Sequence, residues 1–170
     1  MNMLNIIEKK KFGKELTREE IGFFARAAAE RSVPDYQLSA LLMAIRLNGM
    51  TDRETTELTL AMRDTGDIAD LSPIPGIKVD KHSTGGVGDK LSFIVQPLAA
   101  SFGIKIPSLV GRGLGLTGGT ADKLESIPGF DAALPAARFR RVVESCGVAM
   151  AVQTPSIAPA DGKMYALRDV

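Results

Sequence analysis

Apolar side chains recur at helical spacing through the first 66 residues of the chain. Three segments carry them: Ile21, Phe23, Phe24 and Ala27 on one face of the first; Leu38, Leu41, Leu42, Ile45 and Leu47 in the second; and Leu58, Leu60 and Met62 in the third. Capping boxes at residues 17–20 and 51–54 mark two helix starts. Gly49 and Gly66 mark two helix ends. With a short helix over 3–10, the pattern predicts a four-helix unit.

The pattern changes after a turn-rich stretch at 67–76, which we interpret as a linker. Strands are expected at 77–79, 104–110 and 148–152, and helices at 91–102, 136–145 and from 158 onward. Strands that alternate with helices through short loops predict a parallel sheet. The predicted fold class is α/β, with a small N-terminal helical-bundle domain (1–66) and the first part of a mostly parallel sheet domain (77–153).

The last predicted helix reaches residue 170 without a glycine or proline that would end it. Three strands are also few for a parallel sheet, because such a sheet needs both of its faces covered. These two features favour a fragment of a longer protein over a complete chain with a frayed terminus.

Composition narrows the classes of function. The net charge of +1 and the 45% of hydrophobic residues indicate a globular protein, not a disordered chain or a nucleic-acid binder held by a basic face. No apolar run approaches the ~18–20 residues of a membrane span. The single cysteine, Cys146, excludes a disulfide framework and suits a reducing compartment. We expect a cytoplasmic protein with no membrane and no nucleic-acid partner.

A glycine-rich loop at 81–90 lies between a predicted strand and a predicted helix. Its glycines allow backbone N–H groups to approach a ligand closely, and the helix that follows points its positive end toward them. The hydroxyls of Ser83 and Thr84 and the ammonium of Lys81 add donors for an oxyanion. A P-loop requires the consecutive residues Gly-Lys-Ser/Thr, and here Asp89 separates Gly88 from Lys90. The loop therefore predicts an anion site that is not a nucleoside triphosphate site.

A second glycine-rich loop, at 111–120, follows the next predicted strand. Residues 113–118 match the G-x-G-x-x-G pattern of dinucleotide-binding proteins. That pattern should be followed by a helix and then by a strand ending in an acidic residue. Only Asp131 is near, and no helix and strand fit before it, so a nicotinamide or flavin site is disfavoured.

Both loops follow strands of one parallel sheet, so they are expected to face one crevice at the carboxyl ends of the strands. Thr120 stands at a probable helix start, from which its hydroxyl can reach the same anion. The alternative interpretation is that Thr120 only caps that helix.

These loops, at 81–89 (KHSTGGVGD), 111–120 (GRGLGLTGGT) and 122–125 (DKLE), closely resemble the pyrimidine-nucleoside phosphorylases, the family that includes thymidine phosphorylase. The resemblance extends over the whole chain, to its last residues at 165–170. It implies that the chain is an amino-terminal portion of a longer enzyme. It also implies a homodimer that forms through the N-terminal helices, and a helix at 154–170 that returns to the helical domain.

The resemblance implies a site for phosphorolysis, in which phosphate attacks the sugar of a pyrimidine nucleoside and releases the free base and a (deoxy)ribose 1-phosphate. No organic cofactor and no acid or base residue is assigned, and the lone histidine is interpreted as a neutral hydrogen-bonding group. By matching position, phosphate binds Lys81, Ser83, Ser92 and Thr120, the pyrimidine contacts His82 and Arg168, and the backbone at Gly88 holds potassium.

The chain departs from the family pattern at several positions. Val110 stands where relatives usually carry a serine that contributes to phosphate binding. Ser108 shares its strand face but lies about 6–7 Å further along, and whether it compensates is open. Leu116 replaces a usual histidine. Lys90 replaces a small residue beside the cation site, where its ammonium can displace potassium.

Two other interpretations remain. Phosphoribosyltransferases of the same architecture, such as anthranilate phosphoribosyltransferase, also carry a Thr-Gly-Gly turn after the first strand, although in a different local sequence. A non-catalytic helical dimerisation fragment is the second alternative. We expect the family's enzymatic activity to need more than these 170 residues.

Overall fold

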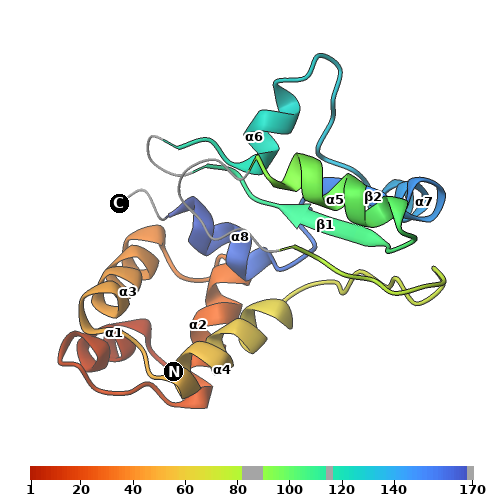
Figure 1. Cartoon of the computed structure of the whole chain (residues 1–170). Helices are drawn as coiled ribbons and strands as arrows, with labels where there is room; N and C mark the ends of the chain where they lie inside the picture. The colour runs from red at the N-terminus through yellow and green to blue at the C-terminus, as the bar shows by residue number, and fades with distance from the viewer. Residues whose placement is uncertain (82–89, 114–116, 168–170) are drawn as a thin grey trace. The chain divides into compact units, whose positions relative to one another are not determined.

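The computed structural model describes residues 1–81, 90–113 and 117–167, and it divides into two compact units (Figure 1). The helical unit comprises Met1–Ile68 together with the described residues from Pro155 on. The α/β unit comprises Ala69–Thr154. Among the described residues, every helix is too short or too polar to cross a membrane.

The helical unit contains the predicted N-terminal helices and one helix from the end of the chain. Their bounds are α1 (Met3–Lys11), α2 (Arg18–Glu30), α3 (Asp35–Asn48), α4 (Asp52–Arg63) and α8 (Pro159–Ala166). Both predicted capping boxes form, with the hydroxyls of Thr17 and Thr51 each accepting from the N–H three residues on, at 3.3 Å. Each box satisfies backbone donors that a helix start would leave unpaired.

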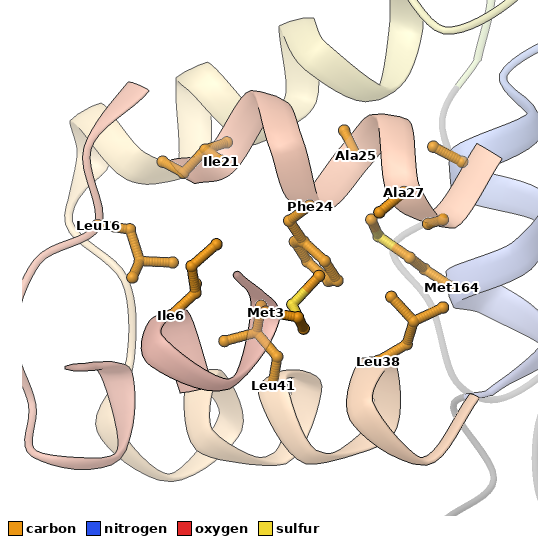
Figure 2. Packing of buried hydrophobic residues seen from close by; sticks show 12 residues of the cluster. Met3, Ile6, Leu16, Ile21, Phe24, Ala25, Ala27, Leu38, Leu41 and Met164 are labelled. Carbon is orange, nitrogen blue, oxygen red and sulfur yellow. The ribbon is translucent and has the colours of Figure 1, made fainter. Parts of the chain in front are cut away.

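The core of the helical unit lies between α1, α2 and α3 (Figure 2). Phe24 of α2 points toward Met3 of α1, and Ile21 and Phe24 are both fully buried, as their spacing predicted. Met164 of α8 packs into the same core beside α2. Helix α8 ends at Ala166, where the Leu167 N–H closes a tighter turn on the Met164 carbonyl at 3.1 Å, and the part of the predicted helix over 168–170 lies outside the described residues.

In the described part of the α/β unit, two parallel strands, β1 (Ile106–Val110) and β2 (Val148–Val152), pair from Ile106↔Val148 to Val110↔Val152. The helices are α5 (Ser92–Ser101), α6 (Thr120–Glu125) and α7 (Ala136–Cys146). The prediction of a strand at 77–79 is wrong, because only one parallel bridge forms there, Lys78↔Lys105. Ile77 is 72% exposed, so this short segment buries no apolar face that would extend the pairing.

The core of the α/β unit joins α7 to β2 through Phe139, Val143 and Ala149. Ile74, within the stretch that composition marks as a linker, is buried in this core, and Leu71 packs against it. The polar turns around Ile74 conceal this apolar contact in the sequence.

Candidate functional site

The residues on either side of the first glycine-rich loop meet in the α/β unit. The ammonium Nζ of Lys81 donates to the hydroxyl Oγ of Ser92 at 3.2 Å. Ser92 is the first residue of α5 and is 2% exposed. Two of the predicted phosphate-binding groups, a cation and a hydroxyl, therefore lie together at the start of a helix, where the helix dipole favours an anion.

Helix α5 buries a polar side and exposes apolar side chains. Ser92 and Gln96 are one turn apart and both are almost fully buried, whereas Ile94 and Leu98 are exposed. The amide Nε2 of Gln96 donates to the Ser108 hydroxyl on β1 at 3.0 Å. Gln96 thus connects the helix that carries Ser92 to the strand that precedes the second glycine-rich loop.

The carbonyl Oε1 of Gln96 is the one buried side-chain acceptor without a hydrogen-bond partner among the described residues. A buried acceptor left unpaired costs free energy, so such groups are rare and call for an explanation. Gln96 is not among the predicted site residues, although a glutamine within the apolar run 93–98, one turn after Ser92, is a signal of this polar side.

The structure gives Ser108 a contact within the α/β unit. Its side chain is 1% exposed, and its hydroxyl accepts the hydrogen bond from Gln96. Val110 ends β1 and is half-buried. Ser108 therefore serves the contact between helix and strand, and a second role in place of the serine that the family pattern expects at position 110 stays a prediction.

The second glycine-rich loop is closed by a carboxylate from α6. Asp122 Oδ2 accepts the N–H of Gly113 at 2.6 Å and the N–H of Gly119 at 2.8 Å. These two donors, followed by Arg112, lower the pKa of Asp122. Arg112 bridges Asp122 at 3.2 Å and Glu125 at 2.7 Å.

Glycine is required where the two ends of this loop meet. A Cβ on Gly113 would overlap the backbone of Thr117, and a Cβ on Gly119 would overlap the backbone of Gly111 and Arg112. Backbone segments that approach this closely leave no room for a side chain. The glycines in this loop therefore allow the chain to close on itself.

The third described residue of the predicted phosphate set is Thr120, the first residue of α6. It directly follows Gly119 and is 7% exposed. The backbone around it is tied back to β1, since the Ala121 N–H donates to the Gly111 carbonyl at 3.1 Å. The other predicted site residues, His82, Ser83, Gly88 and Arg168, lie outside the described residues, as does Leu116.

Potential metal ligands are scattered over the described parts of the chain. In residues 1–81, 90–113 and 117–167, no three His, Cys, Asp or Glu side chains are grouped so as to hold a metal ion. Lys90, the predicted competitor for potassium, is exposed. The potassium contact predicted at Gly88 stays a prediction.

Comparisons with known proteins agree with this architecture. The helical bundle domain of the glycosyl transferase family matches residues 4–66, and the a/b domain of that family matches residues 76–170. The crystal structure of anthranilate phosphoribosyltransferase from Thermus thermophilus superposes with a TM-score of 0.69 at 23% identity, covering 96% of this chain and 49% of that one. The predicted fold class is confirmed.

Curated relatives confirm the resemblance seen in the two loops. The pyrimidine-nucleoside phosphorylases of Geobacillus stearothermophilus and Bacillus subtilis are each 52% identical over all 170 residues. The chain spans 39% of the length of each. Since the a/b domain alone matches more than half of its residues, the chain belongs to the glycosyl transferase family that combines a helical bundle domain with an a/b domain.

Proposed function

We propose that the protein containing these residues is a pyrimidine-nucleoside phosphorylase. It transfers the (deoxy)ribosyl group of a pyrimidine nucleoside to phosphate and releases the free base. The observation that carries the proposal is the contact between Lys81 and Ser92 beside the glycine-rich loops, in a chain similar over its whole length to enzymes of that name.

The phosphate end of the reaction needs donors that hold an anion close to the sugar. The Ser92 hydroxyl accepts from Lys81, so its own hydrogen is left to donate to a phosphate oxygen. The Lys81 ammonium adds a charge-assisted contact, and we assign Thr120 as a further donor. Fixed donors of this kind position the nucleophile and need no proton transfer of their own.

At the base end, negative charge develops on the departing pyrimidine. We assign His82 and Arg168 to contact it, because the resemblance places both there. A guanidinium donates to a carbonyl oxygen and stays protonated, so it can stabilise the departing anion without acting as an acid. Ser83 belongs to the phosphate set on the same ground, and potassium at Gly88 remains a subsidiary proposal.

The direct test is phosphate-dependent release of uracil from uridine and of thymine from thymidine, with a phosphate-free control. We expect release by the complete protein and none by the 170 residues alone. Release without phosphate would indicate a hydrolase, and no release by the complete protein would overturn the proposal.

Lys81→Ala in the complete protein tests the site itself. Loss of a charge-assisted contact should raise the KM for phosphate roughly tenfold or more and leave the KM for the nucleoside nearly unchanged. Lys78→Ala is the matched control, since Lys78 is an exposed lysine of the same segment. Equal phosphate kinetics in the two variants would contradict the assignment of Lys81.

The two alternatives give different results. A phosphoribosyltransferase requires phosphoribosyl pyrophosphate and a divalent cation, and the likeness to anthranilate phosphoribosyltransferase concerns the fold alone. If the helical unit serves only in dimerisation, the protein forms a folded dimer that does not turn over nucleosides.

We also propose a homodimer through the N-terminal helices. Exposed apolar side chains on α1 and α3, among them Leu4, Tyr36 and Leu47, support it. Light scattering after size exclusion measures the mass in solution, and a monomer at micromolar concentration would contradict the proposal. A cytoplasmic location is proposed as well, supported by the exposed free thiol of Cys146, which suits a reducing compartment.

A further inference from the structure

The side chain of Asp122 occupies the position at the second glycine-rich loop where a bound anion would be expected. Glycine-rich loops bind phosphate when their backbone N–H groups converge on it. Here the N–H groups of Gly113 and Gly119 converge on one oxygen of Asp122, at 2.6 and 2.8 Å. These two donors therefore serve an internal carboxylate.

This arrangement is more than a helix cap. Asp122 is the third residue of α6, and its bond to the Gly119 N–H is the usual contact of a capping box. The bond to Gly113 is different, because that residue precedes the helix by seven positions and belongs to the segment that leaves β1. One carboxylate thus joins the end of the strand to the start of the helix.

Arg112 completes the arrangement from outside. Its Nη1 lies 3.2 Å from Asp122 Oδ1, and its guanidinium makes two bonds to Glu125, at 2.7 and 3.0 Å. The Asp122 oxygen that faces the loop and the oxygen that faces Arg112 are therefore both used. Arg112 offsets part of the carboxylate charge beside the proposed anion site.

We propose that Asp122 is a positioning residue for phosphate: it holds the loop closed, so that Thr120, next to Gly119, is held in place to donate to the anion. This inference rests on the proposed function, since it takes Thr120 to be a phosphate ligand. Asp122 itself does not touch phosphate. Its role is to fix the backbone on both sides of the loop.

Two variants separate this role from general electrostatics. Asp122→Asn keeps one oxygen for the two N–H groups but loses the charge and turns an amide toward Arg112, so the loop should fold with weaker closure. Glu125→Gln is the matched control, because it weakens the other partner of Arg112 and leaves both loop N–H bonds intact.

The first measurement is amide hydrogen exchange at Gly113 and Gly119 in the 170-residue chain. Both amides should exchange slowly in the wild type and in Glu125→Gln, and at least about tenfold faster in Asp122→Asn, since each loses a charge-assisted acceptor. Unchanged exchange in Asp122→Asn would overturn the proposal. This measurement involves no substrate, so it holds whatever reaction the protein catalyses.

The second measurement is steady-state kinetics of the complete protein. Asp122→Asn should raise the KM for phosphate several-fold, with a smaller change in the KM for the nucleoside, and Glu125→Gln should change both less than about twofold. An equal rise in both KM values would indicate a general loss of structure and overturn the positioning role. If the wild type shows no phosphate-dependent release, the proposed function fails, and the exchange data still decide whether Asp122 closes the loop.

Discussion

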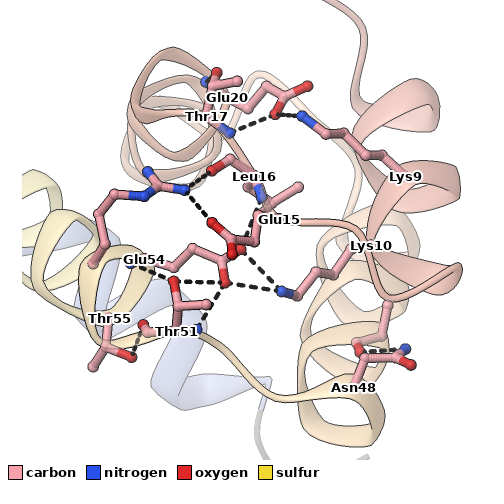
Figure 3. A network of polar contacts seen from close by, with 12 residues as sticks. Lys9, Lys10, Glu15, Leu16, Thr17, Glu20, Asn48, Thr51, Glu54 and Thr55 are labelled. Carbon is pink, nitrogen blue, oxygen red and sulfur yellow. Dashed lines mark hydrogen bonds and ion pairs between the residues drawn. The ribbon is translucent and has the colours of Figure 1, made fainter.

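Each unit of the molecule buries a polar cluster, and the two clusters differ in how completely their atoms are paired. In the helical unit, Glu54 is fully buried and receives Lys10 at 2.9 Å and the N–H groups of Leu16 and Thr51, each at 2.8 Å (Figure 3). In the α/β unit, Gln96 donates to Ser108, but its own carbonyl has no partner among the residues that the structure describes.

We interpret the fully paired cluster around Glu54 as structural, and the incompletely paired cluster around Gln96 as part of the proposed phosphate site. A buried charge is tolerated when every hydrogen-bonding position around it is filled, and both oxygens of Glu54 meet this condition. Such a cluster ties α1 and the 12–16 segment to the start of α4. Gln96 lies one helical turn after Ser92, a proposed phosphate ligand, so polar groups are kept next to that residue at some cost in stability.

The largest effect should follow from breaking the paired cluster. Glu54→Ala leaves the Lys10 ammonium and two N–H groups buried without an acceptor, which should cost about 3–5 kcal/mol of unfolding free energy. Urea denaturation of the chain measures it. Glu57→Ala on the same helix is the control, because its bond to Arg53 is at the surface and is worth less than about 1 kcal/mol. Equal losses of unfolding free energy in the two variants would mean that the buried Lys10–Glu54 pair stabilises the fold no more than a surface pair does.

Lowering the pH should remove the stability that the Glu54 cluster contributes, over a defined range of pH. Burial alone would raise the pKa of Glu54, but the N–H donors of Leu16 and Thr51, together with Lys10, lower it to about 2. The unfolded chain then binds the proton more readily than the folded one, so this stability is present above about pH 4.5 and is lost as the pH falls toward 2.

The expected loss is about 3 kcal/mol across that window. It is measured as the unfolding free energy at a series of pH values, for the wild type and for Glu54→Gln, which cannot titrate at this position. The wild-type curve should fall more steeply than that of the variant. Parallel curves between pH 4.5 and 2 would show that Glu54 is not the group responsible.

The sequence predicted local features well, because capping boxes and hydrophobic spacing are encoded by neighbouring residues. It placed β2 at 148–152, where the structure has it. Glu54 was recognised only as the last residue of a capping box. Its partner Lys10 lies 44 positions away, and no periodicity marks that pairing.

The residues of the candidate site also fall into those that the sequence predicts and those that only the fold brings into contact. Lys81 and Thr120 lie in the glycine-rich motifs, and Ser92 is implied by the family resemblance. Gln96 and Asp122, in contrast, act through contacts that only the fold creates. The strand expected at 77–79 was wrong for a related reason: β-branched residues favour a strand, but no apolar face is buried there. Tertiary packing determines such features.

A smaller effect should follow from changing the incompletely paired cluster. Ser108→Ala leaves the Gln96 amide without its acceptor and should cost about 1–3 kcal/mol of unfolding free energy. Adding Gln96→Leu removes both polar groups, including the carbonyl that is already unpaired, and should restore most of that loss. A double variant less stable than Ser108→Ala would show that the Gln96 carbonyl is favourably placed in the fold.

The phosphate dependence of the complete protein then separates Ser108 from position 110. Ser108→Ala should leave the KM for phosphate nearly unchanged, because its hydroxyl is buried against Gln96. Val110→Ser adds a hydroxyl at the end of β1, where the family pattern expects serine, and should lower that KM about fivefold, the effect of one hydrogen bond of about 1 kcal/mol. If Ser108→Ala raises the KM for phosphate as Lys81→Ala should, then Ser108 serves the ligand, and the polar side of α5 belongs to the phosphate site along its whole length.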